Sequence, residues 1–168
     1  MDTKKLIFLR HGLAADREAW EGSDEERPLT AEGREKMLRI ARGLKKVLPD
    51  PPDAILSSSL LRALETAEIV RAAFPTLSVE IDEGLRPGAL LANFIKKIRR
   101  RKEKTILLVG HEPDFSEWIL SLLGSRRGGF LRLKKGGCSL LEVDLASIPP
   151  RAELIFLLPP KVLRSMSS

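Results

Sequence analysis

Residues 6–12 read Leu6-Ile7-Phe8-Leu9-Arg10-His11-Gly12, a short apolar run that ends in an arginine, a histidine and a glycine. Such a run is typical of a buried β-strand. His111, the second of the two histidines in the chain, follows a similar apolar run at residues 106–110. In an open α/β sheet the carboxyl ends of the strands form the crevice where ligands bind. We therefore expect the two imidazoles to meet there, and histidine is well suited to attack or to move protons near neutral pH.

Strands and helices alternate along most of the chain. Thr30 is a suitable N-cap for a helix whose apolar residues recur at helical spacing as far as Val47, and Pro49 ends this helix. Further strands are predicted at 54–56, 77–81 and 105–109, and further helices at 60–74, 90–101 and 113–123. The last third reads as strands joined by turns, at 139–143 and 152–158, one of them antiparallel at an edge. This order predicts an α/β fold, a three-layer α/β/α sandwich with a mainly parallel sheet.

Length and composition are those of one globular unit. The 168 residues predict a single domain over residues 1–168, with the last few residues as a flexible tail. No apolar run approaches the roughly 20 residues that a membrane-spanning helix needs, and no signal-peptide core precedes Arg10. We therefore expect a cytoplasmic protein with no membrane partner. Cys138 is the one cysteine, which excludes an internal disulfide and favours a small buried residue.

The net charge of +6 comes from one segment. Residues 96–104 hold seven of the 29 basic residues and one of the 23 acidic residues, so the rest of the chain is balanced. This run from Lys96 to Lys104 reads first as the solvated face of a helix, with docking of an acidic or phosphorylated partner as the alternative. It contains no aromatic residue that could stack on bases, so we do not expect nucleic acid as a partner.

Three predicted strand ends carry the polar residues that could form a site. They are Arg10-His11-Gly12, Ser57-Ser58-Ser59 followed by Arg62, and Gly110-His111-Glu112-Pro113. Two histidines and two arginines on one rim suit a tetrahedral anion such as phosphate, because guanidinium groups match its oxygens with paired hydrogen bonds. Helices that start nearby would add free backbone N–H groups. A catalytic zinc normally has three protein ligands, so we expect no metal and no cofactor here.

These segments resemble the histidine phosphatase superfamily, and within it the short phosphohistidine phosphatases of the SixA type. The resemblance covers nearly the whole chain. It rests on Leu9-Arg10-His11-Gly12, Glu26-Arg27-Pro28-Leu29-Thr30 with Gly33, Leu56-Ser57-Ser58 with Arg62-Ala63 and Thr66-Ala67, Val109-Gly110-His111-Glu112-Pro113, and Leu157-Leu158-Pro159-Pro160.

The resemblance implies a division of roles within the site. His11 would be the nucleophile that forms a covalent phosphohistidine, which water then cleaves. Arg10, Arg62 and His111 would hold the phosphoryl oxygens and stabilise their charge, with Gly12 also in contact with the substrate. The neighbouring arginines would disfavour protonation of His11 and so keep it ready to attack.

The chain departs from the superfamily pattern at the proton donor. Many relatives carry a carboxylate after the third strand, where this chain reads Leu85-Arg86-Pro87-Gly88. Asp82 and Glu83 lie just upstream, and Glu83 is the candidate donor, with solvation of the loop as the alternative role. A missing donor suits a phosphoramidate, whose imidazole can be protonated on its other nitrogen before it leaves.

The predicted function is therefore a metal-independent phosphatase whose partner is a protein that carries phosphohistidine. The alternatives are a small-molecule phosphomonoesterase or mutase-like enzyme on a small phosphorylated substrate, and a binding module for phosphorylated or nucleic-acid ligands that uses residues 96–104.

Overall fold

The computed structural model describes residues 3–125 and 130–168, and these form a sheet of six strands in the order β3-β2-β4-β1-β5-β6. Neighbouring strands from β3 to β1 run parallel, whereas β5 is antiparallel to β1 and β6 is antiparallel to β5. The mainly parallel sheet is confirmed. One strand, β5, runs opposite to the other five, as predicted, but it lies one place in from the edge, which β6 occupies. The strands are β1 (Thr3–Arg10), β2 (Ala54–Ser57), β3 (Val79–Ile81), β4 (Thr105–Gly110), β5 (Cys138–Asp144) and β6 (Arg151–Leu158).

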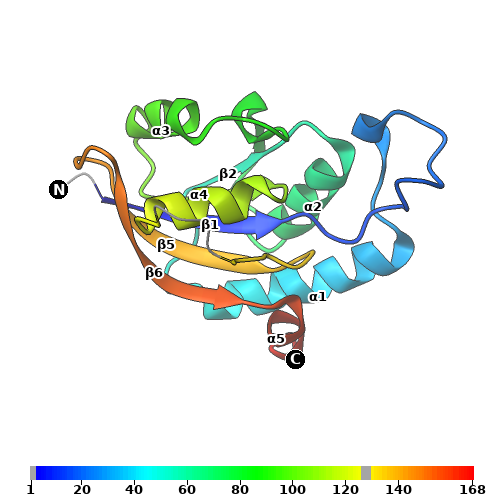
Figure 1. The fold of residues 1–168 in the computed structure, drawn as a ribbon. Helices are drawn as coiled ribbons and strands as arrows, with labels where there is room; N and C mark the ends of the chain where they lie inside the picture. Colours follow the sequence, from blue (N-terminus) through cyan, green and yellow to red (C-terminus); the bar gives the residue numbers. More distant parts are fainter. Residues whose placement is uncertain (1–2, 126–129) are drawn as a thin grey trace.

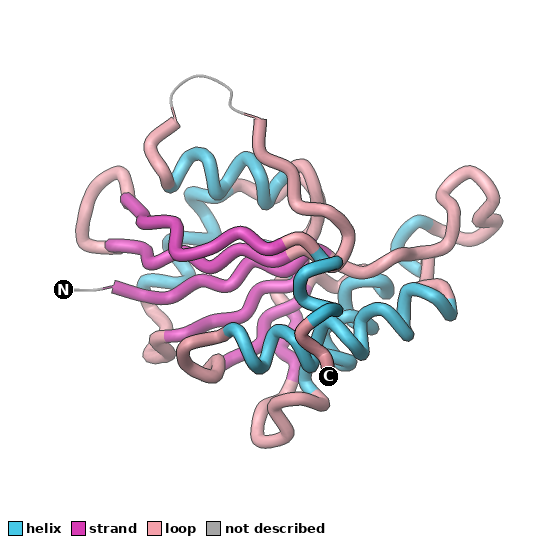
Figure 2. The backbone as a smooth tube through the Cα atoms, turned by 90° about the horizontal axis from the view of Figure 1, so that it is seen from below, coloured by secondary structure: helices cyan, strands magenta, loops and turns pink. Residues whose placement is uncertain are grey.

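Helices cover both faces of this sheet and complete the three predicted layers (Figures 1 and 2). Leu6 and Phe8 of β1 pack against α3 and α4, while Ile7 and Leu9 pack against α1, α2 and α5, because successive strand side chains point to opposite faces. The helices are α1 (Ala31–Val47), α2 (Leu61–Arg71), α3 (Leu91–Arg99), α4 (Asp114–Leu122) and α5 (Pro160–Ser165), with short 3-10 turns η1 (Asp24–Glu26) and η2 (Glu83–Leu85).

Local sequence explains where the helices begin and end. The side chain of Thr30 accepts a hydrogen bond from the backbone N–H of Gly33, so α1 starts directly after its predicted cap and ends before Pro49. The sequence did not predict α5, a six-residue helix with proline at its first position. Its Leu163 is fully buried beneath α1. Cys138 is free and buried, as predicted, and burial raises the pKa of its thiol.

The basic run between Lys96 and Lys104 is partly ion-paired at the end of α3 and in the segment that leads to β4. Lys97 bonds to Asp82 at 2.5 Å, and Arg101 pairs with Glu80 at 2.9 Å and with Glu103 at 2.7 Å. Among the residues that the structure describes, no helix is long and apolar enough to cross a membrane.

Gly43 lets α1 and α5 approach closely, and its replacement by alanine is expected to destabilise the fold. A Cβ atom at Gly43 would lie 1.9 Å from the carbonyl oxygen of Leu163, so α5 would have to move. We expect Gly43→Ala to lower the free energy of unfolding by about 1–3 kcal/mol, measured by chemical denaturation. Arg42→Ala is the matched control, because Arg42 is exposed and arginine and alanine have similar helix propensities. Equal stability of the two variants would show that the close approach is not needed.

Candidate active site

The two histidines meet at the carboxyl edge of the sheet. Arg10 and Gly110 are paired in the register of the parallel strands β1 and β4, so the residues that follow them emerge side by side. The ring centroids of His11 and His111 lie 5.2 Å apart with an interplanar angle of 55°. The predicted meeting of the two imidazoles is therefore confirmed.

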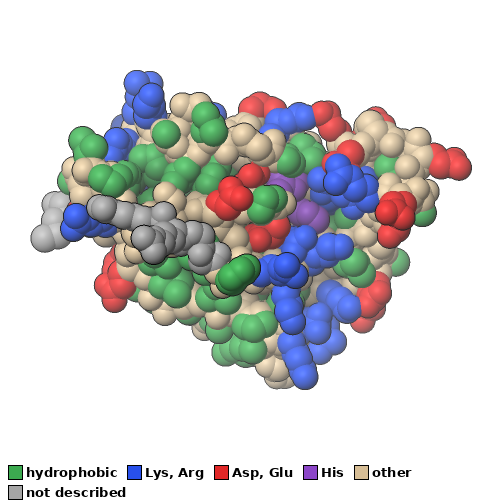
Figure 3. Space-filling view, in the orientation of Figure 1, with side chains coloured by type: hydrophobic (Ala, Val, Ile, Leu, Met, Phe, Trp, Pro, Cys, Tyr) green, Lys and Arg blue, Asp and Glu red, His purple; other side chains and the backbone are tan. Residues whose placement is uncertain are grey.

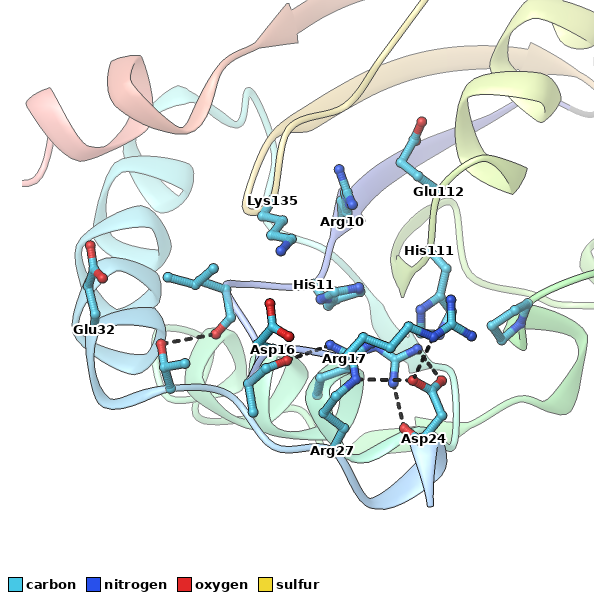
Figure 4. Close-up of a pocket in the computed structure, with 16 residues that line it drawn as sticks. Arg10, His11, Asp16, Arg17, Asp24, Arg27, Glu32, His111, Glu112 and Lys135 are labelled. Atoms are coloured by element: carbon cyan, nitrogen blue, oxygen red, sulfur yellow. Dashed lines mark hydrogen bonds and ion pairs between the residues drawn. The ribbon is translucent and has the colours of Figure 1, made fainter. Parts of the chain in front are cut away.

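A cavity of about 640 Å³ opens over this strand edge (Figure 4). Arg10, His11, Arg62 and His111 all line it, so the structure brings together the four residues that the sequence singled out. Further cations and acids on its wall come mainly from the segment between β1 and α1, which contributes Asp16, Arg17, Asp24 and Arg27. Glu32 of α1, Glu112 and Lys135 complete the wall.

His11 is held in one tautomer by the backbone. Its Nδ1 lies 2.8 Å from the carbonyl oxygen of Gly12, which can only accept a hydrogen bond, so Nδ1 carries the proton and Nε2 keeps its lone pair. The N–H of Gly12 in turn donates to the hydroxyl of Thr66 at 3.0 Å, which fixes this loop against α2. Burial lowers the pKa of His11 to about 3, with further lowering by His111, Arg62 and Arg10.

His111 is oriented by Ser58. The Nε2 atom of His111 lies 2.8 Å from the Ser58 hydroxyl oxygen, and both side chains are buried. Burial also lowers the pKa of His111, to about 4, and the positive charge of Arg62 lowers it further although Asp24 opposes this. Both imidazoles are therefore neutral at physiological pH.

We predict that neither His11 nor His111 takes up a proton near neutral pH in the folded protein. Because the pKa of His11 is lowered to about 3 and that of His111 to about 4, neither ring should bind a proton between pH 8 and about 5. The unfolded chain binds protons at both histidines below about pH 6.5, so the free energy of unfolding should fall as pH falls from about 6.5 toward 4. The imidazole proton NMR signals test this, with His111→Asn to assign them. A ring that titrates near pH 6.5 in the folded protein would contradict it.

The two arginines each leave one buried donor without a partner. Arg10, at the end of β1, donates from Nη1 to the carbonyl oxygen of Leu133 at 2.9 Å. Arg62, near the start of α2, is only 4% exposed and donates from both Nη atoms to Asp24. Among the described residues, the Nε atoms of Arg10 and Arg62 have no hydrogen-bond partner. An unpartnered buried donor costs about 1–3 kcal/mol, a cost that a hydrogen bond to an anion would offset.

Asp24 is the site residue that sequence reasoning missed. Its carboxylate accepts from Arg62 at 3.1 Å and from Arg27 Nε at 3.0 Å, and Arg17 lies 3.7 Å away. Burial raises the pKa of Asp24, but the bond from Arg27 and the charge of Arg62 outweigh it and lower the pKa overall. The Arg27-Pro28 motif nearby was the signal that could have indicated this segment.

Glu83 and Gly12 are placed differently from the other predicted site residues. The Glu83 side chain is 62% exposed and lies 3.4 Å from Arg86, which also pairs with Glu25. Glu83 is not among the residues that line the cavity, although Pro87 is. Gly12 lines a neighbouring groove, and its N–H is already bonded to Thr66. The structure therefore brings neither residue to the centre of the cavity.

Glu112 follows His111 and is half-buried beside Arg10. Burial raises its pKa, and its Oε2 accepts a hydrogen bond from the Ser116 hydroxyl at 2.5 Å. In Figure 4 its carboxyl group points away from the two imidazoles. Within residues 3–125 and 130–168, no group of three or more histidine, cysteine, aspartate or glutamate side chains is placed to hold a metal ion.

The α/β sandwich is shared with solved structures of proteins described as phosphatases. The SixA protein histidine phosphatase, solved with tungstate, superposes with a TM-score of 0.79 at 21% identity, over 95% of this chain and 99% of that one. A mycobacterial glucosyl-3-phosphoglycerate phosphatase superposes with a TM-score of 0.70 at 18% identity, over 94% of this chain and 99% of that one.

Sequence comparison places the chain in a family. Residues 6–87 match the Histidine phosphatase superfamily (branch 1), a range that includes Arg10, His11 and Arg62. An uncharacterized protein of Picosynechococcus sp. is 37% identical over 162 residues, which span 94% of this chain and 97% of the relative. The chain belongs to the histidine phosphatase superfamily and is a phosphatase of that superfamily.

Proposed function

We propose that this chain is a metal-independent phosphatase that acts on phosphohistidine in proteins through a covalent phosphohistidine at His11. The observation that carries the proposal is the bond from His11 Nδ1 to the Gly12 carbonyl oxygen, which leaves Nε2 as a neutral nucleophile beside His111, Arg10 and Arg62. The likeness to a protein histidine phosphatase in fold supports the choice of substrate.

The reaction has two displacements at phosphorus. In the first, the Nε2 lone pair of His11 attacks phosphorus while the P–N bond of the substrate breaks. Arg10, Arg62 and His111 stabilise the charge on the three phosphoryl oxygens during this transfer. The leaving imidazole already holds a proton on its other nitrogen, so it departs neutral. In the second displacement, water attacks phosphorus, inorganic phosphate leaves and His11 regains its lone pair.

The placement of the acids supports a P–N bond as the target. Cleavage of an ester needs a proton for the leaving oxygen, and a donor must reach that oxygen. Glu83 is at the exposed rim and pairs with Arg86, and Glu112 points away from the imidazoles. A substrate that brings its own proton has no need of either carboxyl group.

One experiment tests both the choice of substrate and the role of the carboxyl groups of Glu83 and Glu112. Purified protein in a chelating buffer is given a phosphohistidine peptide and a panel of small phosphomonoesters. We expect kcat/KM for the peptide to exceed that for the esters, and Glu83→Gln and Glu112→Gln to leave turnover of the peptide unchanged. Preferred turnover of esters, or loss of peptide turnover in chelator, would refute the proposal.

A small-molecule phosphomonoesterase is the second candidate, and the carboxylates on the cavity wall favour it. Asp16 is exposed at the mouth, and burial raises the pKa of Glu112 so that it holds its proton closer to neutral pH. The likeness to a glucosyl-3-phosphoglycerate phosphatase in fold is in line with it. Marked loss of ester turnover in Asp16→Asn or Glu112→Gln, with the peptide a poor substrate, would decide for this function.

A further inference from the structure

A second cavity adjoins the active site and is lined by basic residues. It has a volume of about 430 Å³ and shares Arg10, Leu13 and Lys135 with the active-site cavity, so the two lie side by side. We call it the basic groove, and its cations besides Arg10 are Lys36 of α1, Arg132, Lys134 and Lys135 of the segment before β5, and Arg164 of α5.

Backbone hydrogen bonds hold one wall of the basic groove against the catalytic strand. The N–H of Gly136 donates to the carbonyl oxygens of Arg10 at 3.1 Å and His11 at 3.2 Å, and the N–H of Arg10 donates to the Gly137 carbonyl oxygen at 3.1 Å. These bonds fix the backbone that follows Lys134 and Lys135 against the end of β1. The basic groove is therefore built into the fold at the side of the active site.

The cations of the basic groove are mostly unneutralised. Among the described residues Arg132, Lys134, Lys135 and Arg164 form no ion pair with an acidic side chain, whereas Lys36 bonds to Glu32. At the opposite rim of the active-site cavity, by contrast, Arg86 is paired with Glu25 and Glu83. Figure 3 shows Lys and Arg side chains gathered beside the two histidines and continuing across the same face. Like charges held close together repel each other, and an anionic partner relieves this cost.

We propose that the basic groove binds acidic residues that flank the phosphohistidine in the substrate protein; this rests on the proposed function. Arg132, Lys134 and Lys135 are exposed and Arg164 is half-buried, so these side chains face solvent instead of enclosing a ligand. Small ligands are mostly buried by their sites, whereas exposed charges steer and orient a protein partner of opposite charge. The groove adjoins the catalytic cavity, as recognition of a chain flanking the phosphoryl group requires.

The test uses two synthetic peptides with one phosphohistidine each, flanked by glutamates in one and by glutamines in the other. We expect the protein to prefer the glutamate peptide in kcat/KM by on the order of tenfold at low ionic strength, with the preference shrinking as salt is added. The double variant Lys134→Glu, Arg164→Glu should lose this preference and keep its turnover of free phosphohistidine. Both residues lie outside the active-site cavity.

The matched control is the double variant Arg100→Glu, Lys102→Glu, which changes the net charge equally at exposed positions of the basic run. It should keep the preference for glutamate flanks. No preference in the unmodified protein, or equal loss in both double variants, would overturn the proposal. A rise in KM for 3-phosphoglycerate in the groove variant alone would instead assign the groove to a second anionic group on a small substrate.

A binding experiment separates the proposed phosphatase activity from the proposed binding of acidic residues in the basic groove. If no phosphohistidine substrate is turned over, fluorescence anisotropy with the unphosphorylated glutamate peptide still measures occupancy. Binding that the groove variant loses and the control variant keeps supports the groove proposal, and absence of binding to the unmodified protein overturns it.

Discussion

Replacing His11 by alanine is expected to lower kcat by at least about 10³-fold, because the variant lacks the atom that forms the covalent intermediate. The bond from Nδ1 to the Gly12 carbonyl oxygen and the lowered pKa of about 3 both favour a free lone pair on Nε2 at neutral pH. Rapid quenching with a radiolabelled phosphohistidine substrate measures the intermediate directly. The unmodified protein should carry label that is lost in acid and kept in alkali, and His11→Ala should carry none.

The matched control for this variant is His111→Ala. His111 is similarly buried and lies 5.2 Å away between ring centroids, but we expect it to stabilise charge and not to form a bond to phosphorus. His111→Ala should therefore lower kcat by roughly 10²-fold and still carry the label. Label retained in His11→Ala, or lost only in His111→Ala, would exchange the two roles. Thermal unfolding of both variants checks that the fold is intact.

The centre of the site could be predicted because local patterns encode it. The apolar runs before His11 and His111 specify buried strands, and parallel strands end at one edge of the sheet, so the two imidazoles had to approach each other. Arg62 could be predicted in the same way, since it follows the strand end at Ser57 and lies in the first turn of a helix.

The rim of the site could not be predicted, because it depends on tertiary ion pairs. Asp24 lies in a polar stretch with no apolar periodicity, and only the folded chain brings it to Arg62, 38 residues further on. The cations of the basic groove come from α1, α5 and the segment before β5, so no single segment reveals them. The basic run at Lys96 to Lys104 was conspicuous in sequence, yet Lys97 and Arg101 in it are paired with acids.

Antiparallel pairing and short helices were the remaining gaps in the fold. Apolar runs in β5 and β6 identify strands, but their direction follows from the turn between them and from pairing with β1. The six residues of α5 are too few to show helical periodicity, and its single buried side chain is Leu163.

Replacing Arg62 by alanine is expected to lower kcat/KM by roughly 10²- to 10³-fold, because a preorganised donor to the phosphoryl oxygens is removed. The same change should raise the pKa of His111. Burial is the main cause of its low value of about 4, but the charge of Arg62 is the next cause, and Asp24 acts in the opposite direction. In the variant the Asp24 carboxylate loses one of its positive partners, which favours protonated His111 further.

Arg62→Lys separates the charge of this residue from its geometry. Lysine keeps the positive charge, so the pKa of His111 should stay low, but it lacks the planar pair of donors that matches phosphate oxygens. We therefore expect Arg62→Lys to lose much of kcat/KM while the NMR titration of His111 barely moves, and Arg62→Ala to change both. If His111 titrates identically in the two variants, Arg62 does not control its protonation. If Arg62→Ala keeps full kcat/KM, the phosphoryl group is held by other residues, and the role proposed for the buried guanidinium is wrong.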